Sequence, residues 1–265
     1  MTEPDQNSPA PEEGRVRSRG RLLLIVPAVL AAGLLLAAAI ILLTLPDVEK
    51  LRESRPETTA MMEYREAQSR AKGRSFRPRY YWIPGHRISS YLRDAVLIAE
   101  DDKFFQHQGF DWEEMRQAME KNREKKRIVR GGSTITQQLA KNLYLKPVRT
   151  PWRKLREALI ARELEKKLTK VRILELYLNV IEWGDGIYGC EAAARHYYGK
   201  PASQLTPAEA IRLASVIINP HRYSPLSDKS RRMRDKRLLL TETMYKRHLF
   251  DEEVYLALRS GFSPP

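Results

Sequence analysis

The hydrophobic pattern begins with one uninterrupted apolar block near the N-terminus. Residues 22–45 contain no charged side chain. At about 1.5 Å per residue, a helix over this block spans roughly 36 Å, which is enough to cross a bilayer with some tilt. A cleaved signal peptide has a shorter apolar core followed by a small-residue cleavage site. The pattern therefore predicts an uncleaved transmembrane helix.

The charges on the two sides of this block predict its orientation. Asp47, Glu49 and Lys50 follow it, whereas four arginines precede it, at Arg15, Arg17, Arg19 and Arg21. Because positive charge stays on the cytoplasmic side, residues 1–21 are expected to form a cytoplasmic tail, with everything after the helix outside the plasma (cell inner) membrane. The net charge of +14 is typical of a protein with a polyanionic partner. Outside the cytoplasm that partner is membrane phosphate and not nucleic acid.

Beyond the block, the apolar residues follow a helical period. Residues 46–80 are rich in charge and are expected to form a stalk or an irregular helix near the membrane, and residues 81–265 a folded domain. One stripe joins Leu92, Ala95, Val96 and Ala99, and another joins Leu155, Leu159, Ile160, Leu164 and Leu168. Thr206, Pro207 and Glu209 have the spacing of a helix start. Strand-like alternation is scarce, so the fold class is mainly α.

Glu100 ends the first stripe and is followed by Asp101 and Asp102. Partial burial and neighbouring like charges both make a carboxylate a better proton acceptor, as a general base must be. The same residues also fit a helix end exposed to solvent. The stretch alone leaves both interpretations open.

The stretch GGSTITQQLAKN, residues 131–142, also has two interpretations. Thr134 and Gln137 have the spacing of a capping box, which predicts an ordinary helix start after a glycine turn. Free backbone N–H groups, the Ser133 and Thr136 hydroxyls and a positive helix end would also suit phosphate oxygens, and Lys141 would add a positive charge.

The stretch RKLRE places two cations and one acid on one helical face. Arg153 and Glu157 are four residues apart, and Lys154 and Glu157 are three apart. Taken alone, this spacing fits a surface salt-bridge ladder that contributes little to stability.

Three further patterns give weaker evidence about function. The stretch GDGIYG, residues 184–189, matches G-x-G-x-x-G, but a helical pattern and not a strand precedes it, so we interpret it as a turn between helices. No histidine has a metal partner at a usual spacing. The basic stretch KNREKKRIVRGG, residues 121–132, fits a solvated loop or a contact with anionic headgroups.

Taken together, the motifs resemble a known family. EDDKFFQHQG, GGSTITQQLAKN, RKLRE, KVRILELYLN and KRLLLTETM occur in the order and spacing of bacterial peptidoglycan glycosyltransferases, over roughly residues 80–250. Little chain follows the last motif, so we expect the monofunctional, membrane-anchored kind without a transpeptidase module. The family's fifth motif usually opens with two arginines. Here Lys236 and Arg237 compete for that position with Arg231 and Arg232.

The resemblance implies a lysozyme-like helical lobe with a smaller, mobile, membrane-proximal lobe around residues 106–150. It implies polymerisation of lipid II, with the growing glycan chain and other cell-wall synthesis proteins as partners. Glu100 would be the base and Glu157 a second catalytic acid that positions the basic residues or helps hold a divalent cation, Mg²⁺ or Mn²⁺. No metal ligand is firmly assigned and no organic cofactor is expected. Substrate would be bound by six residues: Ser133, Gln137, Gln138, Lys141, Arg153 and Lys154.

Other functions fit parts of the pattern. A lysozyme-like hydrolase would need an acid and a second carboxylate beside a glycosidic bond, whereas this chain offers one base and a basic cluster. An inactive membrane-anchored scaffold would not need the catalytic-type residues. A nucleic-acid module conflicts with the predicted topology.

Overall fold

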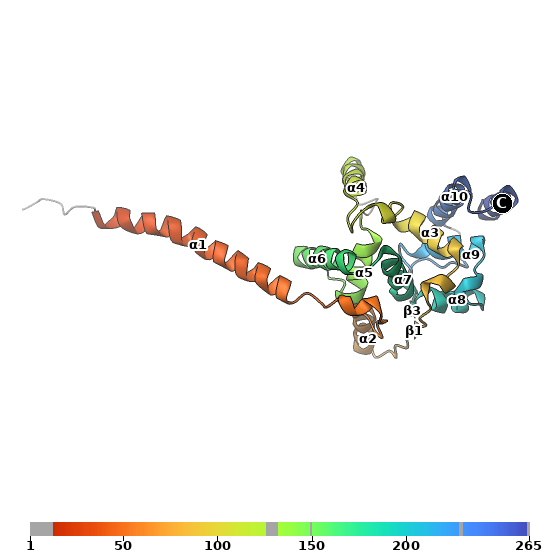
Figure 1. Cartoon of the computed structure of the whole chain (residues 1–265), viewed down its shortest axis with the longest axis horizontal. Helices are drawn as coiled ribbons and strands as arrows, with labels where there is room; N and C mark the ends of the chain where they lie inside the picture. Colours follow the sequence, from red (N-terminus) through yellow and green to blue (C-terminus); the bar gives the residue numbers. More distant parts are fainter. Residues whose placement is uncertain (1–12, 126–131, 149, 228–229, 264–265) are drawn as a thin grey trace, which may run out of the picture. The chain divides into compact units, whose positions relative to one another are not determined.

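The computed structural model describes residues 13–125, 132–148, 150–227 and 230–263, and the chain divides into two units, Met1–Leu45 and Pro46–Pro265. In the first unit, helix α1 runs over Glu13–Leu43 (Figure 1). Its stretch Val26–Leu43 has a mean hydropathy of 2.7 and is long and apolar enough to cross a membrane. The predicted apolar helix is thus present, and it begins before the apolar block itself.

The second unit is mainly helical, which confirms the predicted fold class (Figure 1). Its elements follow one another in this order: η1 Glu49–Arg52, α2 Ala60–Ala71, β1 Arg79–Tyr80, η2 Gly85–Arg87, α3 Ser90–Glu100, η3 Phe104–Gln106, α4 Trp112–Glu124, α5 Ile135–Tyr144, α6 Pro151–Lys167, α7 Lys170–Val180, β2 Glu182–Gly184, β3 Ile187–Tyr188, α8 Cys190–Tyr198, η4 Ala202–Gln204, α9 Pro207–Val216, α10 Arg231–Lys246 and α11 Glu252–Phe262. The strands form one small sheet in the order β1-β3-β2, with β1 parallel and β2 antiparallel to β3. The division into a lysozyme-like lobe and a mobile lobe stays a prediction.

The core lies between helices that are distant in sequence. Helix α5 packs against α6 and α7, and α3 packs against α9 and α10. Tyr177, Trp183 and Phe104 are among the largest fully buried side chains. The predicted stripe on α3 is buried at Leu92, Ala95 and Val96. This packing brings the C-terminal end of α3 to the N-terminal end of α5, where two of the sequence motifs lie.

The two helix starts predicted from capping spacing, at Thr134 and Thr206, are present in the structure. Thr134 and Gln137 form a capping box at α5, and Thr206 and Glu209 form one at α9. Thr150 caps α6 and is followed by Pro151, which suits a first helical position because it has no N–H to leave unpaired. These contacts span three residues, so the sequence alone locates them.

The predicted apolar face of α6 is wrong at its first predicted position, Leu155. The side chain of Leu155 is 44% exposed, whereas Glu157 is only 3% exposed. The buried face consists of Glu157, Ile160, Ala161 and Leu164. Helical period alone does not say which side of a helix meets the core, and here the inward side carries an acid in place of a leucine.

Residues 46–80 belong to the compact unit and supply part of its core. Val48, Leu51 and Met62 are buried. The Nε of Arg172 donates to the backbone oxygen of Leu51 at 2.8 Å, which fixes this segment on the start of α7. The segment expected to form a stalk therefore packs with residues 81–265.

The glycines of GDGIYG shape a hairpin and the start of the next helix. Gly186 has φ 70° in the turn between β2 and β3, and Gly189 has φ 82° just before α8. A Cβ on Gly189 would lie 2.5 Å from the backbone oxygen of Asn179, so only glycine fits. Helix α7 precedes these glycines, as expected, and the loop contains a short hairpin in place of a simple turn.

Candidate active site

The first motif is fixed to the second by a buried aspartate. Asp101, directly after α3, accepts hydrogen bonds from the backbone N of Ile135 at 2.9 Å and from Nε2 of His107 at 2.8 Å. These bonds hold the end of α3 against the first turn of α5. Glu100 is consequently fixed in place by its neighbour in the chain.

Both oxygens of the Glu100 carboxylate have partners. The Nε2 of Gln138 donates to Oε2 at 3.1 Å, and the Nζ of Lys236 donates to Oε1 at 3.3 Å. The Tyr177 hydroxyl donates to Oε1 of Gln138 at 3.0 Å, which orients the amide so that its NH₂ group faces Glu100. The side chain of Glu100 is only 12% exposed, so it is not a frayed helix end in solvent.

The second cluster is built around Glu157 on α6. The Nη1 of Arg153 donates to its Oε2 at 2.5 Å, and the Nζ of Lys154 donates to its Oε1. The acid is buried while both cations reach toward solvent. The arrangement therefore differs from a surface ladder, because a buried acid holds the two cations at one place on the helix.

Ser133 and Gln138 connect the two clusters. The Nε2 of Gln138 lies 3.5 Å from the backbone oxygen of Ser133, and the Nζ of Lys154 lies 3.4 Å from its Oγ. A continuous chain of polar contacts thus runs from Glu100 to Glu157. Residues predicted from three separate motifs lie together in the structure.

Lys141 lies between the two clusters. The pKa of Lys141 is lowered, and burial is the largest cause. Glu157 and Glu100 act in the opposite direction, whereas Arg153 and Lys154 lower the pKa further. Lys141 also lines a cleft of about 450 Å³ together with Gln138 and Tyr177. A cation in this position can meet an anion that enters the cleft.

The pKa of Lys141 gives a pH prediction. Because its folded pKa lies below the ordinary value of 10.5, the folded protein loses this proton at a lower pH than the unfolded chain does. Activity that needs the cation is expected to fall as pH rises through the folded pKa, while the unfavourable burial of charge is relieved and stability rises. In Lys141→Arg, which stays charged, the alkaline fall in kcat/KM moves to higher pH.

The measurement is kcat/KM as a function of pH up to the ordinary lysine range, since this parameter reports groups of the free enzyme. The shape of the profile is compared, because the arginine variant can also differ in overall rate. Lys246→Arg, an exposed lysine on α10, is the matched control and keeps the parent profile. An unchanged alkaline limb in Lys141→Arg would assign that limb to another group.

One predicted substrate-binding position has a different environment from the one expected. Gln137 is buried, and its Oε1 accepts from the backbone N of Thr134 at 3.1 Å, so it braces the start of α5. Lys236, which sequence reasoning left unresolved in the fifth motif, contacts Glu100. Arg237 is buried with its Nε 3.3 Å from Oγ of Ser215.

The competing pair of the fifth motif lies elsewhere. Arg231 is on the first turn of α10, and its side chain is 88% exposed and pairs with Asp235. Only the motif alignment could have suggested Lys236, because the lysine is 136 positions from Glu100 in the chain.

Both oxygens of Glu157 contact cations, Arg153 and Lys154. Within the described residues, Glu157 belongs to no group of three or more His, Cys, Asp or Glu side chains that could hold a metal ion, so its metal role stays a prediction. Among those residues, ligand atoms gather within 4.8 Å at Glu182, Asp185 and His221. There the Arg65 guanidinium contacts both Glu182 and His221 and already supplies a positive charge.

Comparisons with known proteins show the family to which the chain belongs. A family model described as Transglycosylase matches residues 68–245, so the chain belongs to the transglycosylase family and is a glycosyltransferase. A relative from Aromatoleum aromaticum named "Biosynthetic peptidoglycan transglycosylase" is 51% identical over 70% of this chain and 83% of its own. One of the same name from Laribacter hongkongensis is 54% identical over 63% of this chain and 74% of its own. The resemblance drawn from the motifs is confirmed.

A solved structure, penicillin-binding protein 1A from Haemophilus influenzae, is also similar in sequence. It shares 27% identity and aligns with 47% of this chain and 15% of its own, with a TM-score of 0.30. This low score adds nothing to the fold described above.

Proposed function

We propose that the protein polymerises lipid II into β-1,4-linked glycan strands for bacterial cell wall synthesis and releases undecaprenyl diphosphate. The observation that supports this most is the polar chain from Glu100 through Gln138 and Ser133 to the cluster of Lys154, Glu157 and Arg153. It combines one accessible carboxylate with a group of cations in one connected site. This combination suits a sugar acceptor on one side and a diphosphate on the other.

Glu100 is the base in this proposal. A sugar 4-hydroxyl is a poor nucleophile until a carboxylate takes its proton. As the proton moves to Glu100, the acceptor oxygen forms a bond to C1 of the donor sugar, and the bond from C1 to the diphosphate oxygen breaks. Direct displacement inverts the configuration at C1, so an α-linked donor gives a β-linked product. Lys236 and Gln138 hold the carboxylate in position.

The cations assist departure of the diphosphate. This leaving group is a weak base and needs neutralisation of its growing negative charge in place of a proton. Lys141, Arg153 and Lys154 supply positive charge, and Ser133 and Gln138 contact the substrate between them. Glu157 positions Arg153 and Lys154, a role that follows from its two ion pairs. An ion-paired acid of this kind is a poor proton donor, which disfavours a lysozyme-type hydrolase.

The membrane is the second part of the proposal. α1 anchors the protein in the plasma membrane with the N-terminus in the cytoplasm and the catalytic domain outside, where lipid II and the growing glycan chain are met. The stretch 121–132 fits a solvated loop or a contact with headgroups, and its residues 126–131 lie outside the described residues. Other cell-wall synthesis proteins are proposed as partners.

The test is polymerisation of labelled lipid II by the purified full-length protein in detergent, with and without moenomycin, an inhibitor of the resembled family. Glycan strands that disappear with the inhibitor are expected, and NMR of the product should show β linkages. Release of soluble muropeptides from intact cell wall, with no polymer from lipid II, would instead identify a hydrolase. A retained configuration at C1 would contradict direct displacement.

A further inference from the structure

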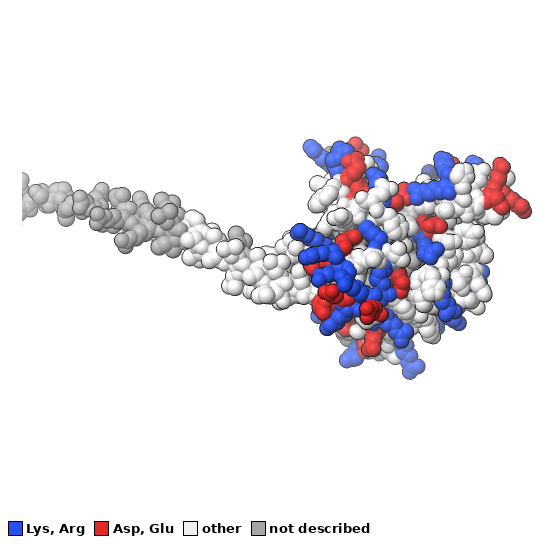
Figure 2. All heavy atoms as spheres, viewed as in Figure 1, with Lys and Arg blue, Asp and Glu red and all other residues white. Residues whose placement is uncertain are grey.

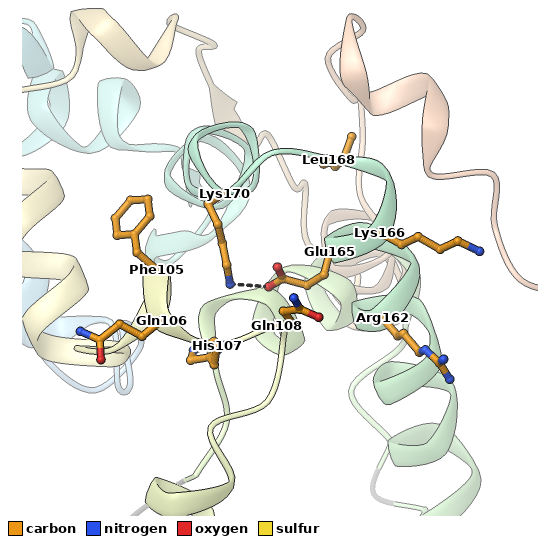
Figure 3. A pocket seen from close by; sticks show the side chains of 9 residues that line it. All are labelled: Phe105, Gln106, His107, Gln108, Arg162, Glu165, Lys166, Leu168 and Lys170. Carbon is orange, nitrogen blue, oxygen red and sulfur yellow. Dashed lines mark hydrogen bonds and ion pairs between the residues drawn. The ribbon is translucent and has the colours of Figure 1, made fainter.

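A second cavity, of about 650 Å³, lies apart from the site described above. Phe105 and His107 line it from the segment after α3, and Arg162, Glu165 and Lys166 line it from α6 (Figure 3). No residue of the Glu100 or Glu157 clusters contributes to its wall. We call this cavity the α6 pocket.

An ion pair in the α6 pocket is already fully engaged. The Nζ of Lys170 lies 2.8 Å from Oε1 of Glu165, and the Thr136 hydroxyl donates to the same oxygen at 2.5 Å. The Lys170 ammonium also lies 4.3 Å from the centre of the Phe104 ring. These contacts fix the pair and neutralise the acid, so the pair offers a ligand little net charge.

Two other cations that line the pocket are not paired with any described residue. Arg162 and Lys166 are exposed and four residues apart on α6, and within the described part of the chain neither forms a hydrogen bond or ion pair. Figure 3 shows both side chains extending from α6 away from the Lys170–Glu165 pair. Like charges at this spacing destabilise a helix slightly, and an anion between them would remove the repulsion. Lys and Arg side chains also gather over α6 on the face drawn in Figure 2.

The C-terminal end of α6 is tied to the segment that follows the membrane anchor. The Nε of Arg52 donates to the backbone oxygen of Lys167 at 2.8 Å, and the Nζ of Lys167 donates to Glu49 at 3.0 Å. Glu49 follows Leu43, the last residue of α1, by six positions. Since six residues reach at most about 20 Å, the length of chain allows this end of α6 to reach the headgroups of a bilayer that holds α1.

We propose that the α6 pocket binds the phosphate of an anionic phospholipid headgroup at its outer edge, between Arg162 and Lys166. A guanidinium binds phosphate in a bidentate manner, and an ammonium adds a mobile positive charge. Phe105, 57% exposed at the pocket, offers an apolar ring that can insert at the boundary between headgroups and acyl chains. The inference rests on the membrane placement proposed above but not on the glycan reaction. It adds a lipid site separate from the catalytic one.

The experiment measures lipid binding by the full-length protein in neutral detergent, with native mass spectrometry as the readout. The probes are short-chain phosphatidylglycerol, short-chain phosphatidylcholine and inorganic phosphate. The parent is expected to bind one phosphatidylglycerol in preference to phosphatidylcholine. In Arg162→Gln/Lys166→Gln this binding weakens about tenfold to thirtyfold, as expected for loss of two cations near an anionic headgroup.

The control is Arg195→Gln/Lys246→Gln, which removes the same charge from exposed positions on α8 and α10 and should bind phosphatidylglycerol within twofold of the parent. Equal weakening in both double variants would overturn the site, because general charge would explain it. Inorganic phosphate that binds as tightly as phosphatidylglycerol would overturn the lipid as ligand. Binding of an N-acetylglucosamine oligosaccharide that depends on the two cations would also overturn the lipid as ligand.

Polymerisation of lipid II in detergent free of phosphatidylglycerol separates this inference from the proposed function. The Arg162→Gln/Lys166→Gln variant should polymerise at the parent rate, and loss of that activity would place the pocket within the catalytic machinery and contradict a separate site. A parent that binds phosphatidylglycerol but does not polymerise lipid II would contradict the proposed function alone.

Discussion

Glu100→Gln is expected to lower the rate of lipid II polymerisation by a factor of about 10²–10⁴ while the fold stays intact. The amide has the shape of the carboxylate but cannot accept the proton of the acceptor hydroxyl. Lys236 also loses the anion that it contacts at 3.3 Å. Initial rates with labelled lipid II measure the effect, and circular dichroism with thermal unfolding confirms the fold.

A neighbouring acid provides the control for this variant. Asp102 is two positions further along, about half exposed, and paired with Arg247 at 2.7 Å. Asp102→Asn changes the charge by the same amount and should polymerise at close to the parent rate. Parent-like activity in Glu100→Gln would remove Glu100 from the role of base, and equal loss in both variants would indicate a general effect of charge.

Glu157→Gln is expected to lower kcat/KM about 100-fold, because Arg153 and Lys154 lose the buried anion that positions them. Loss of two charged hydrogen bonds should also reduce the free energy of unfolding by about 2 kcal/mol. Activity is measured over a titration of Mg²⁺ and Mn²⁺. Since both oxygens of Glu157 are held by cations, the relative metal response of the variant should match that of the parent.

The matched control for the second variant is Glu163→Gln, an acid on the same helix that lines neither the cleft nor the α6 pocket. It should keep parent activity and the parent metal response. If the metal response disappears in Glu157→Gln alone, Glu157 is a metal ligand and the positioning role is wrong. If stability falls without a change in kcat/KM, the acid is only structural.

The order of the motifs predicted most residues of the candidate site. The motifs named Glu100, Ser133, Gln138, Lys141 and the RKLRE residues without any coordinates, and the structure places them in one connected group. The roles of these residues remain proposals until the variants above are assayed. Gln137 illustrates the limit, because a glutamine in the motif can face substrate or cap its helix. Its buried contact with Thr134 shows which of these the fold uses.

Sequence alone determined the features that depend on neighbours within a few residues. The apolar helix, the capping boxes at Thr134 and Thr206, and the mainly helical fold class all follow from local spacing, since hydrogen bonds and side-chain faces repeat within three or four positions. The order of the motifs also indicated the family to which the chain belongs. These are properties that a chain carries before it folds.

Only the tertiary structure decided which side of each helix faces inward and which distant residues meet. It buried Glu157 in place of Leu155 and brought Lys236 to Glu100 across most of the domain. It also packed the segment expected to be a stalk against α7 through Arg172. The physical reason is that burial and ion pairing at these places depend on several elements packing at once, and no local period encodes the separation of residues far apart in the chain.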